Sequence, residues 1–296
     1  MKVESLLDEA VKNPDFLCES GSRLYGTSTP ESDYDLRGFV FPPFEYLIGV
    51  KNFECKELEG DHKVYSAKYF LQLVLKGDPQ CTELLFADSK HILRKSSLAE
   101  PIIALRDDMV SNAMFNRIMG YSNSEWRKAI GIKIIPSKKK KEKEELINDI
   151  RNLYHPSKKD MDDLLKKIDS FDEKTIVSSK KEVSGTRKAD FEEFGYARKN
   201  AAHAIRLVTQ VTELMIHGNI IFPRPNTGTL MKIRRGEFSK NAVQEIYDES
   251  VLEAENVRKL SVLPDKPNYN KVWDIYRDIV ANLVARDIRV KSFLSL

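Results

Sequence analysis

The feature that most constrains this chain is a Gly-Ser turn followed closely by two aspartates. Gly21 and Ser22 come directly after the stretch 16–20, which begins Phe-Leu-Cys, and Asp33 and Asp35 stand two residues apart. Residues i and i+2 of a β-strand point to the same side. If residues 33–36 form a strand, both carboxylates project together while Tyr34 and Leu36 face the core. We therefore predict short strands over 16–20 and 34–41, separated by the Gly-Ser turn and then a helix or a loop.

Small residues after a strand allow backbone N–H groups to approach phosphate oxygens closely. Carboxylates on a rigid element can hold divalent metal, and two-metal phosphoryl transfer places its ions ~3.5–4 Å apart. An isolated Asp-x-Asp is more often a capping or surface feature, but Gly21-Ser22 stands ten residues before the acids. The combination predicts Mg²⁺ (or Mn²⁺) and a nucleoside triphosphate, with ATP as the first choice.

Charge and cysteine usage narrow the class of protein. The 296 residues include 48 basic and 45 acidic side chains, so the formal net charge of +3 does not by itself indicate a nucleic-acid partner. The three cysteines are far apart and form no Cys-x-x-Cys pair, which argues against a disulfide framework or a zinc ribbon. No leader-like start and no 18-residue apolar run occur. We expect a cytoplasmic protein that does not enter a membrane.

Periodicity predicts an α+β fold in which the first 95 residues form one α/β unit. We expect a helix over 4–12 and a hairpin over 52–66 that turns at Glu59-Gly60. Helices follow, with Gly77 as a C-terminal cap and Asp78-Pro79 as the start of the next helix.

The rest of the chain divides into three predicted segments. Residues 96–134 are predicted to form a helical connection. Apolar residues recur at helical spacing over 102–132, and Gly120 is a weak point inside this predicted helix. Residues 135–190 read as a charged, exposed and partly mobile insertion that includes the basic block Lys138 to Lys141. Residues 191–296 form a helical C-terminal region that completes the nucleotide site.

A polar stripe is predicted on one helix of that C-terminal region. Its members recur at i, i+4, i+7 and i+11, which spans ~60° of a helix with 3.6 residues per turn. The opposite side is apolar and packs into a core. The stripe consists of Lys199, His203, Arg206 and Gln210, and the core side of Ala201, Ala204, Ile205, Val208, Val211 and Met215.

Over Gly21 to Gly38 the chain resembles the DNA polymerase β-type nucleotidyltransferase superfamily, whose signature is Gly-Gly/Ser, a short spacer and Asp-x-Asp/Glu. More narrowly, the stretch resembles the predicted nucleotidyltransferases of the RNA repair pathway polymerase-β family. Further similarity lies in 68–86, 195–207 and 230–237. The resemblance implies a small mixed sheet with flanking helices, followed by a helical C-terminal region.

The resemblance also implies roles for single residues. Asp33 and Asp35 would bind metal, and a third carboxylate would complete the site; Asp61 is the candidate, with Glu57 and Glu59 as competitors. The residues expected to contact the nucleotide are Gly21, Ser22, Arg23, Ser32, Lys199, His203 and Arg206.

Five positions of the C-terminal region leave alternatives open. Tyr196 could stack on a base or belong to the core. Arg234, Arg235 and Glu237 could complete the pocket or form a surface ion pair. Where relatives carry an acid after the Gly-aromatic pair this chain has Ala197, which puts the acceptor assignment in doubt.

The expected reaction moves a nucleoside monophosphate from an NTP to an acceptor hydroxyl and releases pyrophosphate. The acceptor implied by the resemblance is an RNA end, with tRNA among the candidates. The same chemistry could instead modify a protein or a small molecule. An alternative of another class is a catalytically silent module that binds a nucleotide or a partner. The sequence leaves the oligomeric state open.

Overall fold

The computed structural model describes residues 3–135, 175–178 and 186–294. The chain forms two compact units, the first made of Met1–Ser124 with Ala202–Leu296 and the second of Glu125–Ala201. Most of the predicted insertion over 135–190, with the basic block Lys138 to Lys141, lies outside the described residues.

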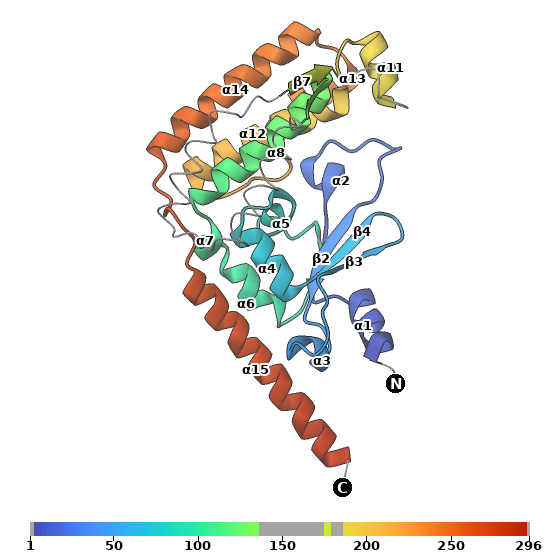
Figure 1. Ribbon diagram of the computed structural model, residues 1–296, viewed down its shortest axis with the longest axis vertical. Coiled ribbons are helices and arrows are strands. Elements are labelled where there is room, and N and C mark those ends of the chain that lie inside the picture. The colour runs from blue at the N-terminus through green and yellow to red at the C-terminus, as the bar shows by residue number, and fades with distance from the viewer. Residues whose placement is uncertain (1–2, 136–174, 179–185, 295–296) are drawn as a thin grey trace, which may run out of the picture. The chain divides into compact units, whose positions relative to one another are not determined.

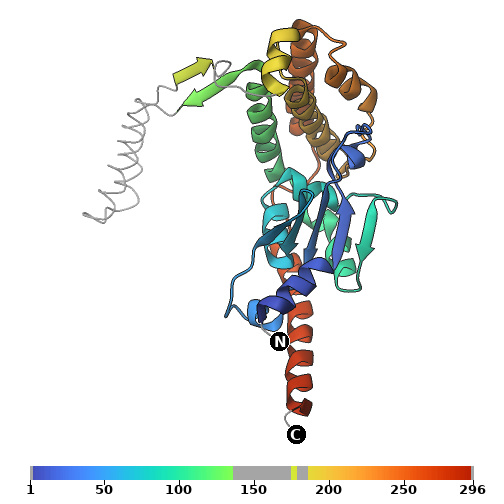
Figure 2. The ribbon, with the colours of Figure 1, turned by 90° about the vertical axis from the view of Figure 1, so that its right-hand side faces the viewer.

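The first unit contains a five-stranded mixed sheet in the order β3-β4-β2-β1-β5 (Figures 1 and 2). β2 pairs in parallel with β4, and the other neighbours are antiparallel. This confirms the predicted α+β class and the mixed sheet. The strands are β1 (Phe16–Glu19), β2 (Leu36–Val40), β3 (Cys55–Leu58), β4 (His62–Ser66) and β5 (Ile92–Lys95).

The central strand β2 places apolar side chains on both faces of the sheet. On one face Phe39 stacks between Phe16 of β1, at 5.5 Å between ring centroids, and Phe70, at 4.7 Å. On the other face Val40 belongs to a cluster with Val11. Phe70 lies in α4 (Ala67–Leu75) and Val11 in α1 (Val3–Lys12), so each helix covers one face.

The two helices after the hairpin begin where the sequence predicts them. The Ser66 hydroxyl accepts a hydrogen bond from the Tyr69 N–H at the start of α4. Asp78 caps α5 (Pro79–Leu84), because its carboxylate accepts from the Gln80 and Cys81 N–H groups, both at 3.1 Å. Each cap satisfies backbone donors that a helix start leaves unpaired.

The predicted long helix over 102–132 is wrong, since three helices occupy this region. They are α6 (Ala99–Ala104), α7 (Arg106–Met109) and α8 (Ala113–Ile130), and Gly120 lies inside α8 without breaking it. The break falls at 110–112, where Asn112 is bonded to a distant loop. Its N–H donates to Pro264 O and its side-chain amide to Leu263 O, both at 2.9 Å. Tertiary hydrogen bonds thus replace helical ones there.

The C-terminal helices confirm the predicted helical region, and most of them belong to the first unit. α15 packs against α6, α7 and α3 (Phe44–Leu47), with Tyr276 stacked on Phe41 at 5.9 Å (Figure 1). Among the described residues no helix is long and apolar enough to cross a membrane. The helices are α12 (Arg198–His217), α13 (Thr227–Arg235), α14 (Lys240–Leu260) and α15 (Tyr269–Leu294).

The second unit holds a two-stranded antiparallel ribbon of β6 (Ile132–Ile135) and β7 (Thr175–Ser178), and the helix α11 (Thr186–Glu193). Asp190 of α11 is 4% exposed and accepts hydrogen bonds from the backbone and guanidinium of Arg198 at 2.9 and 2.8 Å. This pair fixes the start of α12.

Thiol reactivity tests the burial pattern. Cys18 and Cys81 are 0% exposed, whereas Cys55 is exposed on the edge strand β3. Burial raises the pKa of Cys18 to about 12 and that of Cys81 well above its ordinary value. Because the thiolate is the reactive form, we expect one of the three thiols to react with Ellman's reagent in the native protein and all three in denaturant. Cys55→Ser should abolish the fast reaction, and a second fast thiol would contradict the fold.

Candidate active site

The two aspartates of the opening motif lie in the loop directly before β2. The prediction that they belong to the strand is wrong, because β2 begins at Leu36. Tyr34 does not face the core either, since its side chain is 40% exposed. The backbone oxygen of Asp35 accepts from the Ser20 N–H at 2.9 Å. This bond continues the β1–β2 pairing by one step and fixes Asp35 beside the end of β1.

Gly21 allows the Asp35 carboxylate to lie against the backbone. A β-carbon built on Gly21 would stand 2.1 Å from Oδ2 of Asp35 and 3.1 Å from its Cγ. Gly21 also has φ of +63°, a left-handed conformation that side chains other than glycine rarely adopt. The Gly-Ser turn and the second aspartate, fourteen positions apart in the chain, are therefore in contact.

The parallel pairing of β2 with β4 brings Asp61 to the same place. Arg37 pairs with Lys63, so two residues earlier the register sets Asp35 beside Asp61. The pKa of Asp35 is raised, first by burial and then by the charge of Asp61 and a hydrogen bond with it. The charge of Asp33 raises that pKa further, while Arg37 lowers it. The structure thus brings Asp35 and Asp61 together, with Asp33 near enough for its charge to act.

Asp61 is favoured over the two other acids of the hairpin. Glu57 points to Lys63, with which it forms an exposed ion pair of 2.8 Å, whereas Glu59 and Asp61 are both exposed, so exposure does not separate these two acids. Asp61 has φ of 59°, and among the described residues it alone combines a side chain with positive φ. Aspartate tolerates this conformation better than most residues, and strained positions cluster at functional sites. Its role as a metal ligand stays a prediction.

The donor chemistry of these acids suits a divalent cation. Mg²⁺ prefers oxygen ligands and is commonly held by one or two carboxylates together with phosphate oxygens. Asp35 and Asp61 supply two adjacent carboxylates, and a cation would offset the repulsion that raises the pKa of Asp35. Within 3–135, 175–178 and 186–294, no three His, Cys, Asp or Glu side chains are grouped so as to hold a metal ion by themselves.

The predicted phosphate contacts lie on and after α2 (Gly21–Tyr25). The Ser22 carbonyl accepts from the Thr27 N–H at 2.8 Å, which closes the helix end. Arg23 lies over the ring of Tyr34, with its guanidinium carbon 4.9 Å from the centroid. The Ser32 hydroxyl accepts from the Thr29 N–H at 2.8 Å. Arg23 and Ser32 thus have partners within the loop, and their contact with phosphate stays a prediction.

The polar stripe predicted on α12 is not uniformly open to a ligand. Arg206 and Gln210 are 3% and 0% exposed, and His203 is half-buried. The prediction treated all four as one accessible face, which is wrong for Arg206 and Gln210. The Arg206 guanidinium donates to Gln210 and to Glu83, an acid that the helical period of α12 cannot reveal. Lys199 is exposed and belongs to the second unit.

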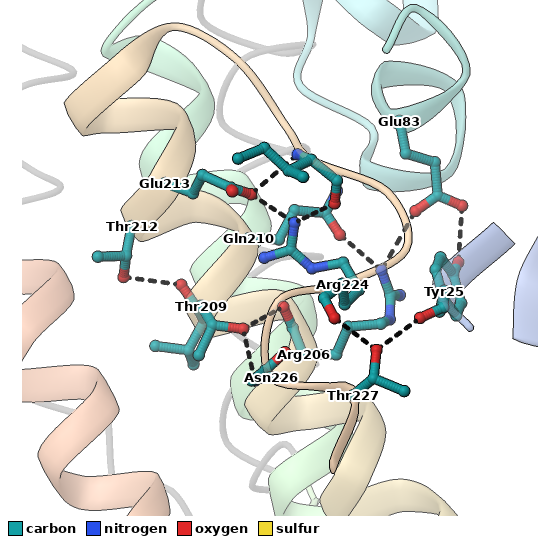
Figure 3. A network of polar contacts seen from close by, with 12 residues as sticks. Tyr25, Glu83, Arg206, Thr209, Gln210, Thr212, Glu213, Arg224, Asn226 and Thr227 are labelled. Carbon is teal, nitrogen blue, oxygen red and sulfur yellow. Dashed lines mark hydrogen bonds and ion pairs between the residues drawn. The ribbon is translucent and has the colours of Figure 1, made fainter. Parts of the chain in front are cut away.

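Arg206 belongs to a buried polar network that sequence reasoning missed (Figure 3). Its guanidinium donates to Glu83 at 3.2 Å and to Gln210 at 2.6 Å. The Tyr25 hydroxyl donates to the other Glu83 oxygen at 2.6 Å. Burial raises the pKa of Glu83, and the charge of Arg206 and the hydrogen bond from Tyr25 oppose it. The available signal was an acid directly before the apolar run Leu84-Leu85-Phe86.

The positions with open alternatives divide between core, loop contact and surface. Tyr196 is 1% exposed and therefore a core residue, and Ala197 beside it is 0% exposed. Arg234 donates to the Thr27 carbonyl at 2.5 Å and so ties α13 to the loop after α2. Arg235 and Glu237 form an exposed ion pair at 2.5 Å, a surface contact of little energetic weight.

Alanine at Gly21 tests the contact with Asp35. The new β-carbon would force the Asp35 side chain away from Asp61, so we expect Gly21→Ala to weaken Mn²⁺ binding by roughly 10- to 100-fold in calorimetry. Gly49→Ala is the matched control, since Gly49 shares positive φ but has no atom within 4 Å of the added carbon. Both variants should lose about 1–2 kcal/mol of stability in urea. Equal Mn²⁺ affinities in the two variants would rule out this role for Asp35.

Comparison with known proteins places these observations in a family. A sequence model described as "RNA repair pathway DNA polymerase beta family" matches residues 9–249. The chain is also 37% identical over 86 residues to the "Uncharacterized 38.9 kDa protein in nrdC-mobD intergenic region" of Enterobacteria phage T4. That match spans 25% of this chain and 26% of the phage protein. No solved structure matches the chain. The family match covers the sheet, the acids and the helices through the first part of α14, and the chain therefore belongs to the RNA repair pathway DNA polymerase beta family.

Proposed function

We propose that the protein is a nucleotidyltransferase that transfers a nucleoside monophosphate from an NTP to an acceptor hydroxyl. The observation that carries the proposal is the meeting of Gly21, Asp35 and Asp61 at one end of the sheet. These residues come from three separate stretches of sequence, and each is of the type that a metal-bound triphosphate requires. The family description, which names DNA polymerase β, supports the same reaction class.

The donor half of the reaction uses residues of the first unit. Gly21 and Ser22 at the start of α2 present backbone N–H groups and a hydroxyl to the β- and γ-phosphates. Arg23 and Ser32 are further candidates for phosphate contact once released from Tyr34 and Thr29. Of the cations proposed from the C-terminal helices, His203, which lies in the first unit, remains a candidate for nucleotide contact. ATP is the first choice of NTP.

Asp33, Asp35 and Asp61 would hold Mg²⁺ or Mn²⁺. When bound, the metal would neutralise charge on the transferred phosphoryl group and on the leaving pyrophosphate. Asp61 would also orient the acceptor hydroxyl and accept its proton. Burial raises the pKa of Asp35, and the neighbouring negative charge of Asp61 raises it further, so both carboxylates favour a cation between them.

An RNA end is the acceptor that we propose, and tRNA is one candidate. The support is the family description, which refers to an RNA repair pathway. The basic block Lys138 to Lys141 provides charge of the right sign for an RNA backbone. The experiments below test this proposal against two alternatives. One is transfer to a protein or a small molecule, and the other is a catalytically silent module that binds a nucleotide.

Substitution of the three proposed metal-binding acids can be compared with substitution of two other acids, Glu57 and Glu59, of the β3–β4 hairpin. Wild-type protein is incubated with each of four α-³²P-labelled NTPs, Mg²⁺, total RNA and total protein, and transferred label and pyrophosphate are measured. We expect Asp33→Asn, Asp35→Asn and Asp61→Asn each to lose about 100-fold or more of the rate, as when a preorganised electrostatic group is removed. Glu57→Gln and Glu59→Gln are the controls and should keep the wild-type transfer rate.

If Asp61→Asn kept full activity while Glu57→Gln or Glu59→Gln lost it, the third metal-binding carboxylate would be that glutamate and not Asp61. If the label appeared on protein but not on RNA, the acceptor would be a protein and not an RNA end. A wild-type protein that binds no NTP and releases no pyrophosphate with any acceptor would defeat the enzyme proposal and favour the silent module.

The RNA acceptor has a separate physical signature. If Lys138 to Lys141 contact phosphates, replacing all four by Gln should weaken single-stranded RNA binding and reduce its salt dependence. The slope of log K against log salt should fall by roughly 0.7 for each lost contact. Fluorescence anisotropy at several salt concentrations measures the slope. An unchanged slope would exclude this block from RNA contact, and transfer of label to RNA would still test the acceptor itself.

A further inference from the structure

Three polar side chains from separate parts of the first unit meet in its interior. Tyr25 is the last residue of α2, Glu83 lies in α5 and Arg206 lies in α12 (Figure 3). Glu83 and Arg206 are 1% and 3% exposed. Buried charges are unfavourable unless they are paired, and apolar side chains of similar volume often stabilise a core equally well. Packing alone therefore does not explain why charged groups occupy this place.

The geometry shows that Tyr25 is held from two sides. Its hydroxyl donates to Glu83 at 2.6 Å, and the guanidinium carbon of Arg206 stands 3.9 Å from the centre of its ring. Arg206 also donates to the second oxygen of Glu83 at 3.2 Å, which closes a triangle of contacts. Rotation of the Tyr25 ring would break two of these contacts at once.

The backbone around Tyr25 is held by the same helical region. The Tyr25 carbonyl accepts from the Arg224 N–H and from the Thr227 hydroxyl, both at 3.1 Å. Two residues later the Thr27 carbonyl accepts from Arg234 of α13. The end of α2 is therefore fixed through both its side chain and its main chain to residues about 200 positions further along the chain.

Arg37 connects the triangle to the acids of the candidate active site. It lies on β2 two residues after Asp35, which stands in the loop directly before that strand. Burial raises the pKa of Asp35 and of Glu83, and the charge of Arg37 acts against burial at both carboxyls. The triangle thus lies within electrostatic reach of the acids.

We propose that Tyr25, Glu83 and Arg206 are positioning residues of the donor site. By fixing the end of α2 they fix Gly21 and Ser22, which begin the same five-residue helix. The inference rests on the proposed function, since those two residues are assigned to the phosphates. It gives Arg206 a different role from the predicted phosphate contact. Directional hydrogen bonds specify one ring orientation, whereas apolar contacts would leave several available.

Amide hydrogen exchange tests the positioning role without nucleotide. Tyr25→Phe removes one hydroxyl, and we expect exchange in residues 21–29 to accelerate by about tenfold, as expected for one lost hydrogen bond to a charged group. Tyr247→Phe is the matched control, because the Tyr247 hydroxyl also donates a bond, of 2.7 Å, but to Asn123 of α8. Equal exchange of residues 21–29 in the two variants would overturn the proposal.

A double variant separates positioning from stability. Glu83→Met with Arg206→Met removes both charges and leaves neither unpaired, while the Tyr25 hydroxyl and the Gln210 carbonyl oxygen lose their partners, so the protein should fold with a lowered melting temperature. We expect this folded protein to bind the Mg²⁺ complex of α,β-methylene-ATP about tenfold more weakly than wild type. Wild-type affinity in the double variant would overturn the proposal.

The two measurements also distinguish this inference from the proposed function. If the wild-type protein bound no nucleotide, the enzyme proposal would fail, and the exchange of residues 21–29 would still decide whether the triangle positions α2. If the double variant did not fold, Tyr25→Phe and Tyr247→Phe would supply the same comparison of nucleotide affinity.

Discussion

The central strand β2 is hydrogen-bonded on both sides, antiparallel to β1 and parallel to β4, and the candidate site depends on this double pairing. The β1 register brings Ser20 to Asp35, and the β4 register brings Asp61 to it. A shift of one residue in either register would turn Asp35 to the opposite face. Gly38 supports the pairing, because a β-carbon there would stand 2.0 Å from the Phe16 carbonyl oxygen. The acids therefore meet through backbone geometry rather than through their own attraction, which their charges oppose.

The second constraint is the ion pair between Glu83 and Arg206. Removing one partner of such a buried pair costs about 3–5 kcal/mol, because the other charge is left unpaired, while replacing both can be nearly neutral. The fold therefore requires each of these two charges only when the other one is present. Its position beside Tyr25 links the α/β part of the first unit to the helices that follow residue 201.

Local signals allowed much of this structure to be predicted from the sequence. The Gly21-Ser22 turn, the hairpin and the Asp78-Pro79 helix start each depend on residues close together in the chain. The errors share a different cause. The break at 110–112 depends on bonds from Asn112 to residues about 150 positions away, and the burial of Arg206 depends on Glu83, 123 positions away. A period of 3.6 identifies which side chains share a face, but not what that face meets.

The start of β2 illustrates the same limit at shorter range. Strand character was predicted for Tyr34, yet Arg23 stacks on its ring and leaves it outside the sheet. Composition at Tyr34 favours a strand, and the contact that decides against it comes from the preceding helix. The convergence of Asp35 and Asp61, by contrast, was suggested by the family resemblance and not by spacing.

The wide separation of Glu83 and Arg206 has a consequence for biosynthesis. The chain leaves the first unit at Ser124 and returns to it at Ala202. A ribosome adding about 5–20 residues per second needs roughly 6–25 s to make the 123 residues between the two partners. During that interval the nascent chain carries the Glu83 carboxylate without the cation that offsets its burial. The end of α2 can therefore reach its final arrangement only after α12 has been translated, although the residues of the opening motif are made well before that helix.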